Sequence, residues 1–276
     1  MAGRRPAYPG YNRCMSAEPL NRCPLLRPFR AVWLLVWLGG GLATLALVFP
    51  LISLRLRGRI ASVWSRGLLA VFGVRLHLSG EMPRGSGLVV ANHVSWLDPF
   101  LLLACFPVRF VAKDEIRSWP VFGWIAVRAG TVFIRRDLRR DVARVTRLFE
   151  ARIDAGEVVA LFPESTTGNG RFLRPFKTAL FQVAVSRDAL CMPVGIRYRQ
   201  RGAEWIDDMG LGESLWRMLG LCRLDVDLLF TPAVAASGRS RRELAQSSEQ
   251  AIAAALSQEV LRNPPDISAG LPDAMP

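Results

Sequence analysis

An uncharged apolar run of 24 residues, from 31 to 54, constrains this chain more than any other feature of its sequence. It lies between Arg30 and Arg55, and about 20 apolar residues are enough for a helix to cross a bilayer. A cleaved signal peptide fits poorly, because the run is too long and no small-x-small cleavage site follows it. A buried helix of a soluble protein is the other alternative, but helices that are apolar on every side are rare outside membranes and large cores. The run therefore predicts a membrane-embedded segment, which we place at residues 31–60.

The orientation of this segment does not follow from the flanking charges. Six arginines precede the run and four follow it by residue 66, so the positive-inside rule gives no clear answer for a single span. Gly39, Gly40 and Gly41 divide the run into two apolar pieces, each short for a full crossing. We favour a re-entrant helical hairpin in one leaflet, with both basic flanks on the cytoplasmic side, and keep a single span as the alternative.

The net charge of +13 is concentrated near the N-terminus. Residues 1–80 hold eleven arginines and one acidic residue, Glu18, so they carry +10 of the total. A nucleic-acid-binding domain is expected to spread its basic residues over a folded face, so this pattern argues against a nucleic-acid partner. With 51% hydrophobic residues and no repeat period, the rest of the chain predicts a folded domain. We therefore divide the chain into a basic segment 1–30, the membrane segment 31–60, a folded domain 61–262 and a disordered tail 263–276.

The cysteines favour a reduced protein, because they form no CxxC pair, their number is odd and none clusters with histidine. They are Cys14, Cys23, Cys105, Cys191 and Cys222. Two histidines are present, His77 and His93, and only the second falls in a polar cluster, so we expect no metal site and no bound cofactor. The sequence thus predicts free thiols in a domain on the cytoplasmic side of a membrane.

Short β-like runs alternate with helical patterns from about residue 64 onwards. The predicted strands are residues 74–78, 88–91, 108–112, 131–134, 158–162, 191–198 and 224–230. The predicted helices are residues 97–105, 121–129, 141–155 and 179–187. Alternation of this kind indicates an α/β fold with a mixed, mostly parallel sheet flanked by helices. Polar residues that follow the strands are then expected where α/β proteins usually place their sites.

The first polar cluster follows the predicted strand 88–91 and contains His93 and Asp98. If the turn between them folds back, the carboxylate orients the imidazole and raises the basicity of its other nitrogen, which makes His93 a general base for a hydroxyl group. A structural alternative is equally specific, since Asp98 before Pro99 is a good N-cap and first-turn pair for the helix 97–105. From these residues alone both interpretations stay open.

Two further clusters also follow strands. The stretch after strand 158–162 contains Glu164, Ser165, Thr166 and Thr167, and reads either as a site or as a simple turn. Arg135 and Arg136 end the strand 131–134, where guanidinium groups suit bidentate phosphate binding or merely add surface charge.

Lysine usage adds a weaker signal. In a chain whose other basic residues are all arginine, the two lysines are Lys113, after strand 108–112, and Lys177, shortly after the cluster that contains Glu164. A compact ammonium group suits a phosphate contact, with chance as the alternative.

Four motifs in this order resemble one family. The segments N-H-V-S-W-L-D at 92–98, G-T-V-F-I-R-R at 130–136, F-P-E-S-T-T at 162–167 and C-M-P-V at 191–194 are similar to the four blocks of the glycerolipid acyltransferases, the lysophosphatidic acid acyltransferase type. The resemblance covers residues 64–235, and four blocks in order are specific where any one alone is not. It favours the catalytic interpretation of the clusters over the cap, turn and surface-charge alternatives.

The resemblance implies a role for each matching residue of the first two blocks. His93 matches the catalytic histidine of the family, and Asp98 matches its partnering aspartate. Arg136 falls on the arginine that contacts the phosphate of the acceptor, while Arg135 occupies a variable position.

The later blocks imply further substrate contacts. Glu164 matches an acceptor-site glutamate, followed by Ser165 in place of the usual glycine and by Thr166 and Thr167. Pro193 matches a proline that shapes the acyl-donor site. Lys113 and Lys177 stand where similar enzymes carry basic residues near the phosphate.

The resemblance further implies transfer of an acyl group from acyl-CoA or acyl carrier protein to the sn-2 hydroxyl of 1-acyl-sn-glycerol-3-phosphate, which yields phosphatidic acid. The donor is a co-substrate, and the enzyme is expected on the cytoplasmic face of a bacterial inner membrane, in contact with the lipid bilayer. Lyso-ornithine lipid is an alternative acceptor, because residues 205–209 and Trp216 are similar to a bacterial subset with that activity.

Two other classes of protein are disfavoured. A serine hydrolase would need a G-x-S-x-G elbow, which the sequence lacks. A non-enzymatic basic membrane-binding protein would have no use for a His–Asp pair.

Overall fold

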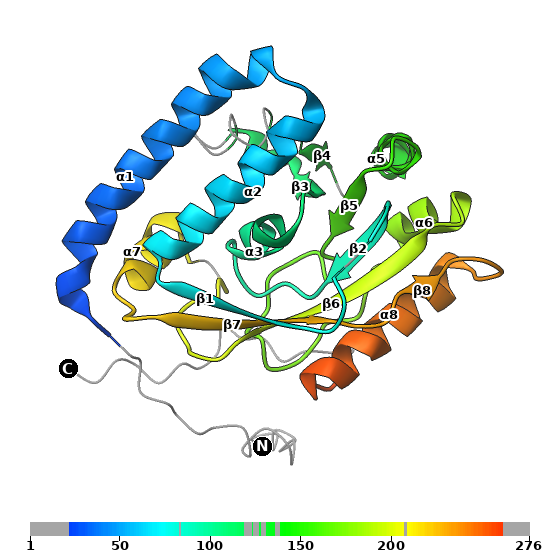
Figure 1. Ribbon diagram of the computed structural model, residues 1–276. Helices are drawn as coiled ribbons and strands as arrows, with labels where there is room; N and C mark the ends of the chain where they lie inside the picture. Colours follow the sequence, from blue (N-terminus) through cyan, green and yellow to red (C-terminus); the bar gives the residue numbers. More distant parts are fainter. Residues whose placement is uncertain are drawn as a thin grey trace, which may run out of the picture.

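The computed structural model describes residues 22–82, 84–118, 123, 127, 131–135, 139–206 and 209–261. The predicted disordered tail 263–276 and most of the predicted helix 121–129 therefore lie outside the described residues. The other predicted elements can be compared with the structure (Figure 1).

An eight-stranded sheet forms the centre of the molecule, with the order β1-β7-β6-β2-β5-β3-β4 and β8 paired to β6. Neighbours are parallel except at β6–β7 and β6–β8, which are antiparallel. The strands are β1 Val74–Ser79, β2 Gly87–Ala91, β3 Arg109–Lys113, β4 Val132–Ile134, β5 Val158–Leu161, β6 Leu190–Tyr198, β7 Leu224–Phe230 and β8 Val234–Ala235. The predicted α/β class with a mixed, mostly parallel sheet is confirmed, and so are all seven predicted strands.

Helices cover both faces of this sheet and bury two apolar cores. The α-helices of the described residues are α1 Arg27–Ala43, α2 Leu54–Val71, α3 Asp98–Cys105, α5 Arg139–Asp154, α6 Gln182–Ser186, α7 Leu211–Leu219 and α8 Arg241–Leu256. One core lies between the sheet and α2, α3 and α7, and the other lies between the sheet and α5, α6 and α8. The helices α2, α7 and α8 and the short strand β8 were not predicted from the sequence.

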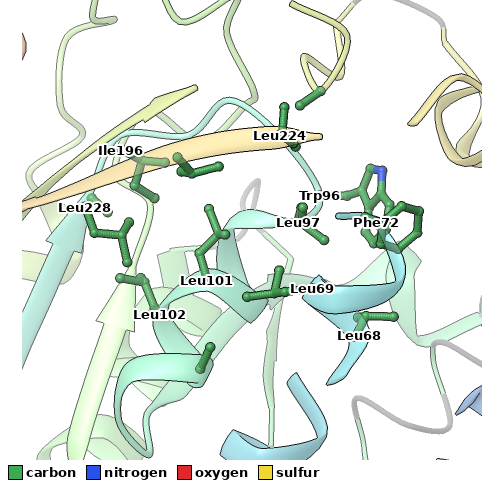
Figure 2. Packing of buried hydrophobic residues seen from close by; sticks show 14 of the residues in the cluster. Leu68, Leu69, Phe72, Trp96, Leu97, Leu101, Leu102, Ile196, Leu224 and Leu228 are labelled. Atoms are coloured by element: carbon green, nitrogen blue, oxygen red, sulfur yellow. The ribbon is translucent and has the colours of Figure 1, made fainter. Parts of the chain in front are cut away.

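The first of these cores fixes the position of α3, the helix that follows the His93 cluster. Figure 2 shows leucines of the α3 segment packed between α2 on one side and the strands β6 and β7 on the other; the labelled residues are Leu68, Leu69, Phe72, Trp96, Leu97, Leu101, Leu102, Ile196, Leu224 and Leu228. Leu97, Leu101 and Leu102 are fully buried, and each such side chain stabilises the fold by about 2 kcal/mol. The start of α3 is therefore held rigidly against the sheet.

The first two helices form a hairpin, but its turn is not where the sequence suggested. Helix α1 continues through Gly39–Gly41 into a π-helical turn, Thr44–Val48, and a short 3₁₀ turn, Phe49–Leu51, and α2 begins at Leu54. The predicted break at the three glycines is wrong, because the helical backbone hydrogen bonds continue across them. Gly41 instead lies in the contact between α1 and α2. A Cβ atom at Gly41 would lie 2.4 Å from Nε1 of Trp64.

Much of α1 and of the two short turns that follow it presents apolar side chains to the outside. The helical stretch Pro24–Leu51 is long and apolar enough to cross a membrane, by length and composition only. Leu35 and Leu47 are each 70% exposed, and Leu51 is 84% exposed. Exposed apolar surface of this extent marks a site of contact with lipid or with another apolar partner.

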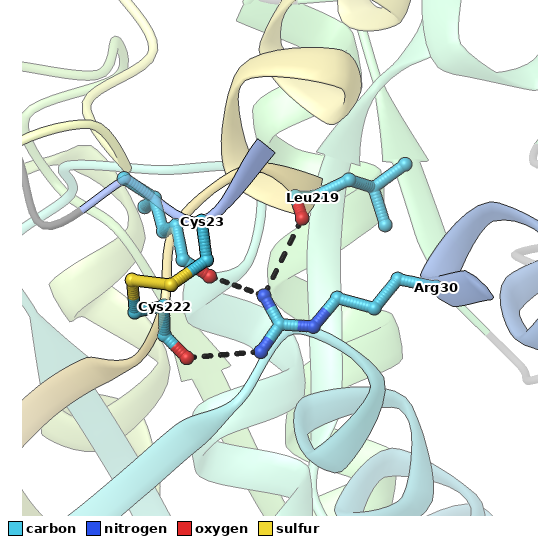
Figure 3. Close-up of a disulfide and its surroundings, with 5 residues drawn as sticks. Cys23, Arg30, Leu219 and Cys222 are labelled. Carbon is cyan, nitrogen blue, oxygen red and sulfur yellow. Dashed lines mark hydrogen bonds between the residues drawn. A yellow bond between two sulfur atoms is a disulfide. The ribbon is translucent and has the colours of Figure 1, made fainter. Parts of the chain in front are cut away.

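A disulfide joins Cys23, just before α1, to Cys222, just before β7. Arg30 of α1 also binds the segment that contains Cys222. Its guanidinium donates to the carbonyls of Leu221 and, at 3.0 Å, of Cys222 (Figure 3). The expectation of fully reduced cysteines is therefore wrong for this pair. The two residues are 199 positions apart, so no local spacing rule indicated the pairing. Of the remaining cysteines within the described residues, Cys105 and Cys191 are free.

Candidate active site

The site begins where β2 ends, at Asn92. The buried Asn92 side chain donates to the carbonyl of Ile196 at 2.9 Å and accepts from the N–H of the same residue at 2.7 Å. These two bonds continue the pairing of β2 with β6 by one residue and hold the backbone that carries His93. Their net contribution is about 1 kcal/mol each, and leaving either group unpaired in the core would be more unfavourable.

His93 and Asp98 form the predicted imidazole–carboxylate pair, with Nδ1 of His93 2.8 Å from Oδ2 of Asp98. The aspartate is fully buried, whereas 18% of the histidine side chain is exposed. A proton on Nδ1 is held by the carboxylate, so Nε2 carries the lone pair that accepts a proton. The geometry of a general base is thus present, and its catalytic role stays a prediction.

The capping alternative for Asp98 is not supported. Asp98 is the first residue of α3, but the helix has no side-chain cap bond. The carboxylate turns back instead, and Oδ2 accepts the backbone N–H groups of Val94 at 2.7 Å and Ser95 at 2.9 Å. The residue thus orders the loop before the helix, which is the loop that carries the histidine.

Two phenylalanines hold the imidazole ring in place. The His93 ring stacks on Phe162, with 4.2 Å between centroids and 14° between planes. Phe162 in turn lies parallel to Phe110, with 5.9 Å between centroids. The stack covers one face of the imidazole and limits its rotation, which preserves the bond to Asp98.

Glu164 lies behind the histidine backbone. One carboxylate oxygen accepts the N–H of His93 at 2.7 Å, and the other accepts the N–H of Arg174 at 2.9 Å. The residue is 5% exposed, and this burial raises the pKa of its carboxyl group to about 7. In the structure the side chain supports the loop, and a direct contact with the acceptor stays a prediction.

The rest of the third motif wraps around the same loop. Ser165 adopts a left-handed conformation, with φ +66°, which explains why glycine suits this position. Thr166 is exposed, and the hydroxyl of Thr167 donates to the carbonyl of Trp205. Lys177 is brought near by its N–H, which donates to the carbonyl of Pro163 at 3.0 Å, and its side chain is exposed.

The basic candidates follow β3 and β4, the two strands beyond β5. Lys113 is the last residue of β3, and its side chain lies outside the described part, as does the whole of Arg136. Arg135 is exposed and donates its N–H to Asp141 at 2.8 Å, a bond that lowers the pKa of Asp141 more than the nearby guanidinium of Arg144 does. A cavity of about 520 Å³ opens here and is lined by Arg117, Arg135, Arg144 and Arg152 among others.

Pro193, the candidate of the fourth motif, lies within β6 opposite Val90 of β2. Its carbonyl accepts both the N–H and the hydroxyl of Thr231, at 3.1 and 3.0 Å. It is enclosed in the sheet, and its effect on the acyl-donor site stays a prediction.

Two residues of the site were missed by the sequence analysis, Asn92 as a clamp and Tyr198 as a partner of Asp98. Both act across distances of about a hundred residues, so no local pattern indicates them. His77, the other histidine, pairs with Asp225 at 3.0 Å on another part of the sheet. The described residues contain no group of three or more His, Cys, Asp or Glu that could hold a metal.

Known proteins resemble this chain over most of its length. The family model described as Acyltransferase matches residues 73–197. The 1-acyl-sn-glycerol-3-phosphate acyltransferase of Neisseria meningitidis serogroup B is 38% identical over 212 residues, which make up 74% of this chain and 83% of that protein. The lyso-ornithine lipid O-acyltransferase of Pseudomonas aeruginosa is 38% identical over 206 residues, covering 73% of this chain and 80% of that protein.

A solved structure has the same fold. The crystal structure of the 1-acyl-sn-glycerophosphate (LPA) acyltransferase PlsC from Thermotoga maritima superposes with a TM-score of 0.67, over 84% of this chain and 94% of that one. The sequence identity is 20%, so this likeness concerns the fold alone.

Proposed function

The chain belongs to the glycerolipid acyltransferase family, and from that premise we propose that it acylates the sn-2 hydroxyl of 1-acyl-sn-glycerol-3-phosphate to give phosphatidic acid. The donor is a fatty acyl thioester, acyl-CoA or acyl-carrier protein. The observation that carries the proposal is the buried Asp98 carboxylate 2.8 Å from Nδ1 of His93, in a protein 38% identical to an enzyme named for this reaction.

In the proposed reaction Nε2 of His93 takes the proton of the sn-2 hydroxyl as its oxygen attacks the thioester carbonyl. The carbon–oxygen bond forms, the tetrahedral intermediate collapses, and the carbon–sulfur bond breaks. The departing thiolate takes the proton from His93, so the enzyme returns to its starting state. Asp98 stays ionised and stabilises the imidazolium while it exists. A thioester is already activated, so this route has no covalent enzyme intermediate.

Basic side chains beside this centre are proposed to hold the phosphate of the acceptor. Arg136, assigned by its place in the second motif, and Arg135 supply planar guanidinium groups for bidentate binding. Lys113 and Lys177 add compact positive charges. Holding the phosphate would place the hydroxyl against His93 and so turn the attack into a positioned event.

The lipid acceptor and the exposed face of α1 support a membrane location. We place the apolar stretch Pro24–Leu51 in one leaflet, with α2 packed on the catalytic domain and that domain on the cytoplasmic face of the inner membrane, where the acyl thioesters are found. Labelling of single cysteines at positions 5 and 60 with a membrane-impermeant reagent tests this topology. Labelling from opposite sides would contradict it.

The decisive experiment for the reaction is His93→Ala, assayed in vesicles with radiolabelled 1-acyl-sn-glycerol-3-phosphate and an acyl-CoA. Loss of the base is expected to lower kcat by about a thousandfold, with membrane association unchanged. His77→Ala is the matched control, because that imidazole pairs with Asp225 away from the site. Full turnover by His93→Ala would refute the proposal.

A second acceptor, lyso-ornithine lipid, is favoured by the Pseudomonas aeruginosa relative, which is equally identical to this chain. That lipid carries an amino acid headgroup in place of the phosphate. Arg135→Ala and Arg136→Ala are expected to raise KM for 1-acyl-sn-glycerol-3-phosphate and to leave KM for lyso-ornithine lipid unchanged. Turnover of lyso-ornithine lipid alone by the wild-type protein would establish the second acceptor instead.

A further inference from the structure

A tyrosine from a distant strand reaches the catalytic pair. Tyr198 is the last residue of β6, and its hydroxyl donates to Oδ1 of Asp98 at 2.6 Å. We propose that Tyr198 is a positioning residue, whose hydroxyl holds the Asp98 carboxylate toward His93 and limits how strongly that carboxylate raises the basicity of the imidazole. The inference rests on the proposed function of His93 as the base.

The two oxygens of Asp98 are held in different ways. Oδ2 accepts from Nδ1 of His93 and from the N–H groups of Val94 and Ser95, all within the loop that precedes α3. Among the described residues, the Tyr198 hydroxyl is the donor to Oδ1. The loop thus fixes Oδ2, whereas the rotation of the carboxylate about its Cβ–Cγ bond also depends on the hydrogen bond from Tyr198 of β6.

The sheet places the tyrosine for this contact. Ala91, the last residue of β2, lies opposite Val194, so β6 runs four residues farther and passes beside the loop 92–98. Tyr198 follows Val194 and Ile196 on the face of β6 that packs toward α3. The same face of the sheet therefore carries the tyrosine and buries the start of α3.

The hydroxyl is a neutral donor over the whole range in which the enzyme would work. Burial and the adjacent Asp98 carboxylate raise the pKa of Tyr198 well above its ordinary value. The nearby Ser95 side chain acts in the opposite direction, but burial and the carboxylate outweigh it. Tyr198 accordingly stays protonated, and the ionised partner in the contact is Asp98.

Removal of this donor has a predictable electrostatic sign. Without it, the buried Oδ1 loses the donor that the described residues supply, so the negative charge of the carboxylate is less compensated and stabilises a protonated imidazole at His93 more strongly. The acidic limb of the rate profile then moves to higher pH. A looser carboxylate also orients the imidazole less well, so kcat falls.

Other charged groups face this site and remain in place when only the hydroxyl is removed. Glu164 bonds to the backbone of His93 from the loop after β5, and Arg174 lies beside Glu164. Glu204, from the loop after β6, acts on Tyr198. Since a Tyr198→Phe variant keeps all three, a change in the pH profile is assigned to the lost bond.

The test is the pH dependence of kcat/KM for Tyr198→Phe with 1-acyl-sn-glycerol-3-phosphate and acyl-CoA in mixed micelles. We expect kcat about tenfold lower, KM for both substrates within about twofold, and an acidic limb about half a pH unit higher. Ser248→Ala removes another buried hydroxyl, on α8, and is expected to leave the profile unchanged. An unchanged limb and kcat in Tyr198→Phe, or a loss of activity explained by a lower Tm alone, would overturn the inference.

A double-mutant cycle separates action through Asp98 from a general structural role. In an Asp98→Asn background, removal of the Tyr198 hydroxyl is expected to lower the residual rate by less than about twofold. A full tenfold loss there would show that Tyr198 does not act through Asp98. If Tyr198→Phe does not fold, 3-fluorotyrosine at position 198 serves instead, because its stronger donor is expected to move the acidic limb to lower pH, and an unmoved limb would count against the proposal.

The two proposals fail in different ways. Turnover by His93→Ala would show that His93 is not the base, and would refute both proposals. An inactive His93→Ala combined with a wild-type profile for Tyr198→Phe would leave the reaction in place and refute only the role of Tyr198.

Discussion

At the scale of single residues, Glu164 links the pH of the medium to the stability of the site. Its carboxyl group has a pKa of about 7 in the folded protein, raised from 4.5 by burial. Between these two values the unfolded chain has released its proton while the folded protein still holds it. The free energy of unfolding therefore falls as pH rises from about 4.5 to about 7, and this contribution is constant outside that window.

Glu164→Gln removes the titrating group and with it this pH dependence, while the loss of one N–H acceptor lowers stability equally at every pH. We expect the difference in unfolding free energy between the variant and the wild type to increase by about 2–3 kcal/mol across the window, in favour of the variant at the higher pH. Thermal unfolding in detergent at several pH values measures it. Parallel curves for the two proteins would mean that Glu164 is ionised in the fold at all of these pH values.

Ser165 stands at the motif position where the family usually has glycine. Its backbone is left-handed, a conformation that glycine adopts without strain and that strains a serine by about 1 kcal/mol. The serine at this motif position therefore adds local strain to the loop.

At the scale of elements, the hairpin of α1 and α2 is held by reciprocal contacts of glycine and tryptophan. The indole of Trp37 donates to the carbonyl of Trp64 at 3.0 Å, and the indole of Trp64 donates to the carbonyl of Trp37 at 3.3 Å. Gly41 lies against Trp64, and Gly67 lies against Trp37. Each tryptophan thus fits over a glycine of the opposite helix.

Gly67→Ala tests this packing, because its Cβ atom would lie 1.9 Å from Cζ2 of Trp37. To avoid the clash the indole must move, which breaks its bond to Trp64, so we expect a loss of about 2 kcal/mol in stability. Gly40→Ala is the matched control, since nothing lies within 4 Å of its Cβ position, and alanine favours helix. Equal unfolding temperatures for the two variants in detergent would contradict the reciprocal packing.

The elements themselves were predictable to different degrees. All seven longer strands follow from apolar runs bounded by turn residues, a signal contained within each segment. Helix α8 begins with a capping box in which the Ser240 hydroxyl and the Glu243 carboxylate each accept the other's backbone N–H. The S-x-x-E pattern that encodes it is present in the sequence and was overlooked.

At the scale of the whole molecule, the Cys23–Cys222 bond joins the start of the hairpin to the catalytic domain. Closing a loop of 199 residues restricts the unfolded chain, so the bond is expected to stabilise the fold by about 2–5 kcal/mol. Reduction should lower the Tm of the wild-type protein and leave that of Cys23→Ser unchanged. Cys105→Ser, at a free cysteine, should respond to reduction like the wild type.

Thiol labelling of the unfolded protein before reduction checks whether the Cys23–Cys222 disulfide is present. With the bond in place, Cys105 and Cys191 are labelled and Cys23 and Cys222 are not. Labelling of all five would mean that the pair is reduced in the cell, as a cytoplasmic location of the domain favours.

The sequence by itself determined the α/β class, the strands and the order of the four motifs, because each is encoded in a few neighbouring residues. It also brought His93 and Asp98 within reach of each other, since five positions of a turning loop are enough for that contact. The sequence left open whether Asp98 caps α3 or pairs with His93. The structure decides this, because the carboxylate points back into the loop and accepts its N–H groups.

Only the tertiary structure decided the contacts that hold this pair. Asn92 meets Ile196, and Asp98 meets Tyr198, each across about a hundred residues, because β6 lies beside β2 in the sheet. The strand order, set by long crossovers and by the burial of two cores, is a property of the whole chain. The sequence therefore determined which groups are proposed to perform the chemistry, and the fold decided which distant side chains contact them.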